Sequence, residues 1–208
     1  MADYLSASQL EQFKRSPLDW AMRYIEKLYI PSGNAASKGT LFHSWIRHLV
    51  TGHPLPTLVG LSGQEMWAVE TQARAMVSRL EDFFSGEWEF EVPFEMVLIE
   101  GAPPVRGFID LLRAKDGLHI FDIKKTTRSL PYVSSRGEQM EGRMYGLRQE
   151  DLITNLQLAV YVLSQKDKFL SFLRGKIGHV QGIVVKRKGF EVGFETDIIE
   201  MDISEKYI

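Results

Sequence analysis

The stretch GFIDLLRAKDGLHIFDIKK, Gly107 to Lys125, decides how this chain is interpreted. Two apolar runs flank Lys115-Asp116-Gly117, a charged segment that ends in glycine and is typical of a turn. They predict strands over Val105 to Arg113 and Leu118 to Lys124. These strands nevertheless contain two aspartates and a lysine, residue types that are uncommon inside strands. The stretch therefore raises the question of what these charges hold.

The spacing of the charges gives a first answer. Asp122 and Lys124 are two residues apart and share one face of their strand. If the turn has three residues, Ala114 pairs with Leu118, and counting back places Asp110 opposite Asp122. Opposed Cβ atoms lie about 4.5–5.5 Å apart, so two bare carboxylates there repel unless a cation lies between them or one keeps its proton. A register error of one residue would break this pairing.

A hard divalent cation with oxygen ligands suits such a gap. The ammonium of Lys124, one step farther on the same face, would orient or deprotonate a water or neutralise charge growing on a phosphate. The alternative is an Asp–Lys ion pair on a solvated face, because the D-x-K pattern is short and common.

The rest of the chain predicts an α/β fold in which a mixed, mostly antiparallel sheet is flanked by helices. Residues 1–86 are expected to be mainly helical and residues 87–208 to form the sheet core, within a single domain spanning 1–208. Helices are predicted after Ser8-Gln9-Leu10-Glu11, which has capping-box spacing, after Ser16-Pro17, over Lys38 to Val50, over Gln64 to Phe84 and over Leu152 to Lys168. Further strands are predicted over Glu87 to Ile99, Val180 to Lys186 and Phe190 to Met201, and loops over Pro31 to Ala36, Gly52 to Gly63 and Leu130 to Glu150.

Composition excludes several chemistries. The chain has no cysteine, so disulfides, thiolate zinc sites, cysteine nucleophiles and cysteine-ligated iron–sulfur clusters are excluded. The net charge of −2 gives no field that attracts nucleic acid to the whole molecule. Two local basic groups remain, Lys124, Lys125 and Arg128, and Lys186, Arg187 and Lys188. The N-terminus lacks the features of a signal peptide and no apolar run is long enough to span a bilayer, so we expect a cytoplasmic protein without a membrane partner.

Four motifs in order resemble the PD-(D/E)XK nuclease superfamily, and more closely its RecB-like exonuclease branch. They are KGTLFHSWI with His43, VRGFIDLL with Asp110, FDIKK with Asp122 and Lys124, and NLQLAVYVL with Gln157 and Tyr161. The N-terminal LSASQLEQFKRSPLDWAMRYI also looks like the opening helices of that branch. The resemblance covers most of the chain and implies a restriction-endonuclease-like core. Some relatives carry an iron–sulfur cluster, which this chain cannot form without cysteine.

The resemblance implies roles for these residues. It makes His43, Asp110, Asp122 and the backbone carbonyl of Ile123 ligands of one or two Mg²⁺ or Mn²⁺ ions. It makes Lys124 the catalytic lysine and places Gln157 and Tyr161, one helical turn apart, as its supports. Without the resemblance, the imidazole would be an ordinary packed side chain and the Gln–Tyr pair part of an ordinary amphipathic helix.

The resemblance implies a magnesium-dependent DNA exonuclease of recombination, repair or phage DNA processing. Its partners would be DNA, as a single strand or duplex ends, and a recombination or annealing protein. Alternatives are a structure-specific or restriction-type endonuclease and a nuclease fold that binds DNA without cutting. Weaker candidates are Glu91 and Glu95 beside the ligands, Thr126, Thr127 and Arg128 as phosphate contacts, and Tyr132 and Tyr145 as stacking platforms for bases.

Overall fold

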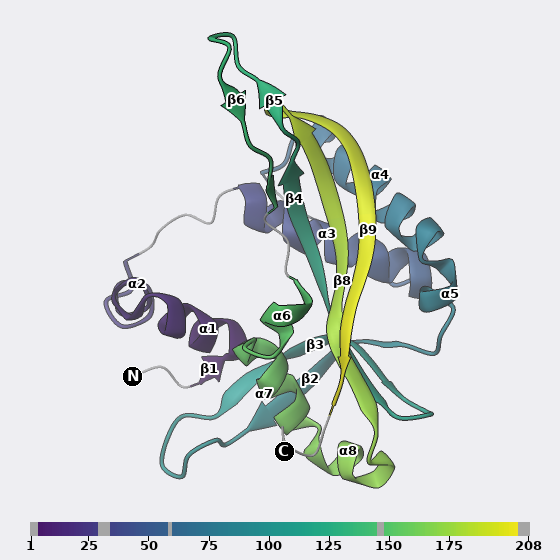
Figure 1. The fold of residues 1–208 in the computed structure, drawn as a ribbon. Helices are drawn as coiled ribbons and strands as arrows, with labels where there is room; N and C mark the ends of the chain where they lie inside the picture. The colour runs from purple at the N-terminus through teal and green to yellow at the C-terminus, as the bar shows by residue number, and fades with distance from the viewer. Residues whose placement is uncertain (1–3, 29–33, 58–59, 145–147, 204–208) are drawn as a thin grey trace.

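A twisted sheet runs through the structure, a computed structural model that describes residues 4–28, 34–57, 60–144 and 148–203 (Figure 1). Within these residues seven strands form one sheet in the order β1-β3-β4-β8-β9, with β2 beside β3 and β7 beside β4. The strands are β1 (Leu5–Ser6), β2 (Glu89–Met96), β3 (Val105–Ala114), β4 (Leu118–Ser129), β7 (Arg143–Met144), β8 (Gly175–Arg187) and β9 (Phe190–Asp202). β1 pairs with β3 and β4 with β8 in parallel, and the other neighbours are antiparallel. The predicted mixed, mostly antiparallel sheet is confirmed.

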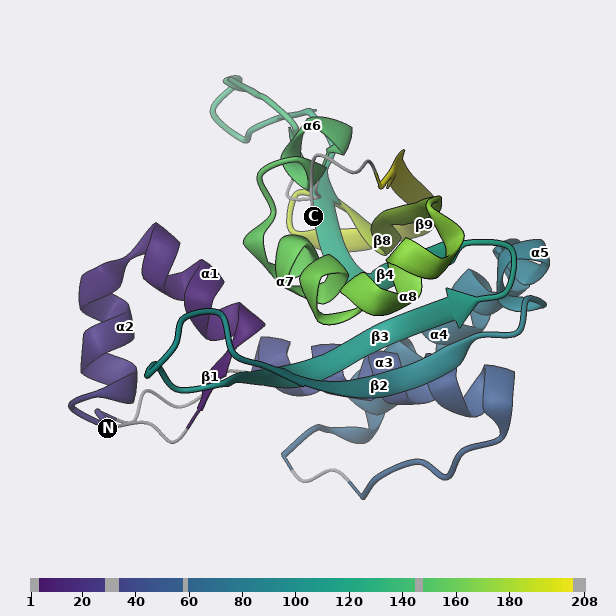
Figure 2. The same ribbon diagram turned by 90° about the horizontal axis from the view of Figure 1, so that it is seen from below.

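Helices cover both faces of this sheet. They are α1 (Ala7–Arg15), α2 (Pro17–Tyr24), α3 (Asn34–Thr51), α4 (Gly63–Arg79), α5 (Glu81–Phe84), α6 (Gln149–Leu152), α7 (Leu156–Ser164) and α8 (Lys166–Phe172). Figure 2 shows α3 and α4 on one side of β2 and β3, and α7 and α8 on the other. The predicted α/β class with flanking helices is confirmed, and no helix in the described ranges is long and apolar enough to cross a bilayer.

Two apolar clusters hold the layers together, because alternate residues of each strand point to opposite faces. Phe121 and Ile123 of β4 pack with Phe42 and Ile46 of α3. Leu118 and Ile120 of the same strand pack with residues of α7 on the other face. Asp122 and Lys124 continue this second series, so the strand directs them toward α7.

The N-terminal helices begin at serines. Ser6 caps α1 by accepting a hydrogen bond from the Gln9 N–H, so the predicted cap at Ser8 is wrong by two residues. Ser16 caps α2 with Pro17 in its first turn, as predicted. The side chain of Glu11, which the capping-box interpretation would have used within α1, instead accepts from the Leu156 N–H of α7.

The structure connects α1 to α7 through a second contact. Lys14 donates from Nζ to the Thr154 carbonyl oxygen at 2.7 Å, next to the start of α7. Residues separated by 140 positions in the chain thus meet side by side. The N-terminal helices therefore help to place the start of α7.

Three sequence expectations are corrected by the helix and strand boundaries. The helix predicted over Gln64 to Phe84 is interrupted at Leu80, whose φ of −114° and ψ of 35° leave the helical region. The helix predicted over Leu152 to Lys168 is likewise divided into α7 and α8 at Gln165. β4 continues five residues beyond its predicted end at Lys124, because its pairing with β8 extends from Leu118 to Ser129.

The predicted loop from Leu130 to Glu150 contains regular structure. A two-stranded ribbon of β5 (Tyr132–Val133) and β6 (Gln139–Met140) extends from the end of the sheet, and β7 returns to pair with β4. Figure 1 shows this ribbon projecting beyond the main sheet. The polar, glycine-containing composition of this segment predicted a loop, and it gave no sign of the short strand pairings that form there.

Candidate active site

The register between β3 and β4 places the site. Ala114 pairs with Leu118, as the turn predicted, and the ladder continues to Leu111 opposite Phe121. The two strands separate after this pair, at the position where counting from the turn predicts that Asp110 faces Asp122. Instead of facing each other across a regular ladder, the two carboxylates now bind different partners.

The side chain of Asp110 accepts the backbone hydrogen bond that a neighbouring strand would otherwise accept. Its Oδ2 accepts a hydrogen bond from the Ile123 N–H at 2.8 Å. In a strand, the N–H and C=O of one residue point to the same edge, so the Ile123 carbonyl oxygen points to the edge where Asp110 lies. The pairing of β3 with β4 ends at Phe121, and β7 pairs with β4 only from Arg128. Between these two points, no strand pairs with this edge of β4 in the part of the chain that the structure describes.

Asp122 is the buried centre of the site, with 1% of its surface exposed. Lys124 Nζ lies 3.0 Å from its Oδ1 and 2.8 Å from its Oδ2, so the two side chains share a face as predicted. Burial favours the neutral acid, but the charge of Lys124 and the hydrogen bond from His179 outweigh it and lower the pKa of Asp122. The carboxylate is therefore held ionised by two partners rather than left bare.

Lys124 is held as an ammonium. Burial favours its neutral form, but the charge and hydrogen bond of Asp122, with the charge of Asp110, raise the pKa of Lys124 above its ordinary value. Its Nζ also donates to Gln157 Oε1 at 3.3 Å. In this arrangement the lysine is a hydrogen-bond donor and a positive charge held beside Asp122 and Gln157.

Gln157 and Tyr161 meet on one face of α7, as their four-residue spacing predicted. Gln157 Nε2 lies 2.6 Å from Tyr161 Oη. Burial, with the charges of Asp122 and Asp110, raises the pKa of Tyr161, which keeps the phenol neutral. Its ring also packs edge-on against Phe94 at 5.6 Å between centroids. The Tyr161 phenol thus orients the Gln157 amide, whose oxygen accepts the hydrogen bond from Lys124.

His179 is the residue that the sequence analysis missed. It is completely buried, lies beside Asp122 in the parallel pairing of β4 and β8, and its Nδ1 is 2.9 Å from Asp122 Oδ2. A signal was present, because His179 and Gln181 are the polar residues at alternate positions in the otherwise apolar segment Ile177 to Val185. The sequence did not show that β8 pairs with β4, so this signal could not be connected to Asp122.

The tautomer of His179 follows from the cap of α7. Asn155 caps this helix by accepting from the Leu158 N–H through Oδ1, so its Nδ2 faces His179 Nε2, at 3.2 Å. An amide nitrogen is a donor, and Nε2 must therefore accept. The proton then lies on Nδ1, which donates to Asp122. The start of α7 and the central carboxylate are thereby connected through one imidazole.

His43 approaches the site from the opposite helix layer. Its Nδ1 on α3 lies 3.5 Å from Asp110 Oδ2. Burial lowers the pKa of His43, but the hydrogen bond and charge of Asp110, with the charge of Asp122, raise it more, and the net direction is upward. The structure therefore brings together His43, Asp110, Asp122, Ile123, Lys124, Gln157 and Tyr161 from α3, β3, β4 and α7.

These donors suit a hard divalent cation in their chemistry. Two carboxylates, an imidazole and a backbone carbonyl converge where β3 leaves β4. Within the described ranges, no three histidine or acidic side chains are placed to hold a metal ion together as positioned. Both Asp122 oxygens lie beside Lys124, and Oδ2 also accepts from His179. Mg²⁺ does not need such a cage, since it usually keeps several waters and binds one or two carboxylates together with substrate phosphates.

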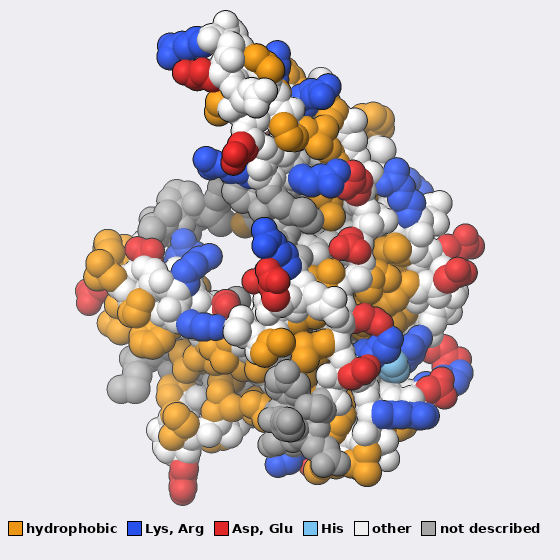
Figure 3. All heavy atoms as spheres, viewed as in Figure 1, with side chains coloured by type: hydrophobic (Ala, Val, Ile, Leu, Met, Phe, Trp, Pro, Cys, Tyr) orange, Lys and Arg blue, Asp and Glu red, His pale blue; other side chains and the backbone are white. Residues whose placement is uncertain are grey.

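The remaining candidates lie apart from this network. Glu91 pairs with Arg47, and Glu95 accepts from Arg106 at 2.7 Å. Arg128 pairs with Glu195. Tyr132 lies on the projecting ribbon, over which Figure 3 shows basic and acidic side chains intermixed, and Tyr145 lies outside the described residues.

Comparisons with known proteins found a matching family model and similar solved structures. A model of the PD-(D/E)XK nuclease superfamily matches residues 4–187. The crystal structure of a candidate exonuclease from Eubacterium rectale is similar with a TM-score of 0.52 and 14% identity, covering 99% of this chain and 74% of that chain. The crystal structure of SSO0001 has a TM-score of 0.36 and 15% identity, covering 99% and 69%. No curated protein matches. At these identities the structural likeness concerns the fold alone.

Proposed function

The chain belongs to the PD-(D/E)XK nuclease superfamily, and on that premise we propose that it is a metal-dependent deoxyribonuclease that hydrolyses phosphodiester bonds at DNA ends. The observation that carries this proposal is the position of Lys124. Its ammonium is held between Asp122 and Gln157, at the edge where β3 leaves β4 and Asp110 lies. A fixed positive charge beside two carboxylates suits a reaction that increases negative charge on a phosphate.

The metal would be held by His43, Asp110, Asp122 and the Ile123 carbonyl, as one or two Mg²⁺ or Mn²⁺ ions. Bound there, it would supply Lewis-acid stabilisation of the phosphate and a water of lowered pKa. Among the described residues no strand pairs with β4 between its junctions with β3 and β7, which supports this assignment because the Ile123 carbonyl oxygen is left without a strand partner on that edge.

The protein's own residues would supply position and charge. Lys124 would donate to a phosphate oxygen or to the attacking water, and Gln157 would restrict the direction of its ammonium. Tyr161 would act through Gln157, and His179 through Asp122, so both are positioning residues. Preorganised donors of this kind cost little reorganisation during the reaction, and removing one typically costs about 10²–10³ in rate.

The choice of an exonuclease rests on the resemblance of the motifs to the RecB-like branch, as does a role in recombination, repair or phage DNA processing with an annealing or recombination protein. We place the whole activity in one domain spanning 1–208.

A digestion assay tests the proposal. Linear single-stranded, linear duplex and closed circular DNA, each labelled, are incubated with Mg²⁺, with EDTA and with the Lys124→Ala protein. We expect Mg²⁺-dependent loss of the linear substrates only, at least about 10²-fold slower in the variant, with DNA binding retained. Cutting of circles would favour an endonuclease. Binding without any cutting would favour a non-cutting DNA-binding module, and cleavage by Lys124→Ala at the parent rate would overturn the assignment of the lysine.

A further inference from the structure

A second group of lysines lies on the other face of β4. Because successive side chains alternate, Lys125 points away from α7 and lies over the Phe42 ring of α3, with Nζ 5.7 Å from the centroid. It lines a recess of about 470 Å³ between α3, α4 and the ends of the β strands. That volume is in the range of about 300–1,000 Å³ that is common for ligand sites.

Three elements contribute lysines to this recess. Lys38 comes from α3, Lys125 from β4 and Lys186 from β8. The two basic groups that the sequence shows separately, one after the D-x-K motif and one 60 residues later, are therefore brought together by the parallel pairing of β4 with β8, in which Ser129 is opposite Lys186. Neither group makes a site alone.

The carboxylates in the recess have partners of their own. Glu65 forms an ion pair with Lys38 at 2.8 Å and accepts from the Ser62 N–H and hydroxyl at 2.9 Å. Glu191 accepts from Gln72 Nε2 at 2.6 Å. Lys125 and Lys186 form no ion pair with a residue in the described ranges. Burial, with the charges of Lys38 and Lys186, lowers the pKa of Lys125 to about 8, so its ammonium is still the main form at neutral pH. A ligand phosphate would supply the anionic partner that these two lysines lack.

The recess also presents a buried hydrogen-bond acceptor. Gln72 is 5% exposed, and its Oε1 has no hydrogen-bond partner among the described residues. Unpartnered buried polar atoms are uncommon in folded proteins. A nucleotide offers both complementary groups, phosphate oxygens for the lysines and base amino groups for the amide oxygen. Gly39, at the rim on α3, has open space where a side chain would begin, so a backbone can approach closely.

The recess and the catalytic lysine are adjacent across one strand. Lys124 and Lys125 are consecutive, and β4 has an open edge at this point in the described structure. A nucleic-acid strand that crosses this edge meets Lys124 on one face and Lys125 on the other. We propose that the recess formed by Lys38, Lys125 and Lys186 binds a backbone phosphate of the nucleotide neighbouring the cleaved bond. The inference rests on the proposed nuclease function and identifies how the substrate strand would be held.

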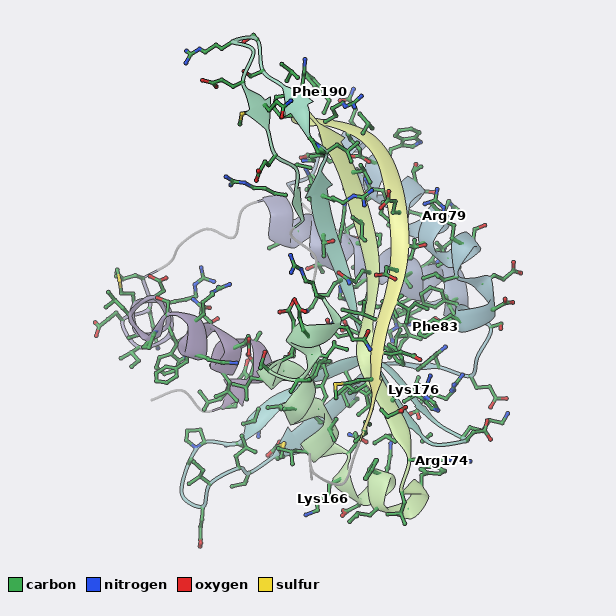
Figure 4. The ribbon with its side chains drawn as sticks, in the orientation of Figure 1. Arg79, Phe83, Lys166, Arg174, Lys176 and Phe190 are labelled. Atoms are coloured by element: carbon green, nitrogen blue, oxygen red, sulfur yellow. The ribbon has the colours of Figure 1, made fainter. Side chains whose placement is uncertain are left out.

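Binding of a fluorescent single-stranded oligonucleotide with a 5′-hydroxyl tests this, in the Lys124→Ala background with Mg²⁺. The variant is Lys125→Gln/Lys186→Gln. Its matched control is Lys166→Gln/Lys168→Gln, which removes the same charge from α8; Figure 4 shows Lys166 at the opposite end of the molecule from Phe190, which follows the β8–β9 turn. Thermal melting verifies that each protein is folded, and Lys125→Arg/Lys186→Arg restores the charge without the original side chains.

We expect the Gln variant to bind at least about tenfold more weakly than the control, and the Arg variant to recover most of that loss. Loss of the contact to this one phosphate should also reduce the slope of log K against log salt by about 0.7, the contribution of each phosphate neutralised on a single strand. Equal affinity and slope in variant and control would overturn the inference. So would absence of binding by the parent, or a loss that appears only when the oligonucleotide carries a 5′-phosphate.

The assay separates this inference from the proposed function, because binding is measured without cleavage. A protein that binds through the recess and never cuts would retain the inference and lose the nuclease assignment. A protein that cuts normally but binds equally well without Lys125 and Lys186 would support the nuclease assignment and overturn the inference about the recess.

Discussion

His179 Nδ1 donates to Asp122 Oδ2 at 2.9 Å, and both side chains are buried. This bond connects the central carboxylate of the site to β8, and through His179 Nε2 to Asn155 at the start of α7. The carboxylate that faces Lys124 is therefore positioned by a strand and a helix that lie far from it in the sequence.

Replacing His179 by alanine should destabilise the protein. The change removes a hydrogen bond to a buried charged group and leaves space in the core, so we expect the free energy of unfolding to fall by about 2–4 kcal/mol. Urea unfolding measures this. The exposed His53→Ala serves as a control and should change stability by less than about 0.5 kcal/mol. A His179→Ala protein as stable as the parent would show that the contact does not hold the site.

Asn155→Asp separates the two functions of Asn155. The carboxylate can still accept from the Leu158 N–H, so the cap of α7 should survive, whereas Asn155→Ala should lose about 1 kcal/mol of stability from the cap alone. In Asn155→Asp an acceptor faces His179 Nε2, which favours a proton there. We expect nitrogen NMR of His179 to show the Nδ1–H tautomer in the parent and a proton on both nitrogens in Asn155→Asp. An unchanged spectrum would contradict the assigned tautomer.

The two aspartates should respond differently to amidation. Asp110→Asn keeps an oxygen that can accept from the Ile123 N–H, so we expect a folded protein with Mn²⁺ affinity lowered at least about tenfold, or ~1.4 kcal/mol. Asp122→Asn also removes the charge that pairs with the ammonium of Lys124, so both affinity and stability should fall. Calorimetric titration with MnCl₂ and urea unfolding give the two readouts. Parent-like Mn²⁺ binding by Asp110→Asn would exclude Asp110 as a ligand.

The start of α4 should respond to acid. The hydrogen bond from Lys38, followed by those from the Ser62 backbone and hydroxyl, lowers the pKa of Glu65 from 4.5 to about 2. Because the folded-state pKa is depressed, the stabilisation is present above pH 4.5 and disappears as the pH falls toward 2. We expect the difference in melting temperature between the parent and Glu65→Gln to shrink over that interval. A constant difference between pH 6 and pH 2 would contradict this origin.

Local features of the sequence predicted local features of the structure. The turn at Lys115-Asp116-Gly117 fixed the pairing of Ala114 with Leu118, and the period of two placed Asp122 and Lys124 on one face. The spacing of Gln157 and Tyr161 placed them together on α7 in the same way. These relations depend on residues close in the chain, and the backbone geometry alone determines them.

Relations between distant segments were not predictable from patterns. The role of His179 depends on the parallel pairing of β4 with β8, which no turn specifies. β3 and β4 separate before Asp110 and Asp122 can pair, and the Ile123 N–H donates to the Asp110 side chain instead of to a strand neighbour. The helix breaks at Leu80 and Gln165 fall in stretches where the apolar periodicity alone predicts one continuous helix. In each case tertiary contacts decide between local conformations that the sequence permits.

The distance between Asp122 and His179 along the chain has a consequence for biosynthesis. The 57 residues that separate them take about 3–11 s to synthesise at about 5–20 residues per second. Until the end of that interval Asp122 lacks its imidazole partner from β8, although α7 is synthesised earlier. The candidate site thus cannot be complete on a nascent chain that ends before β8. Its completion belongs to the late steps of folding, when the long-range pairing of β4 and β8 closes.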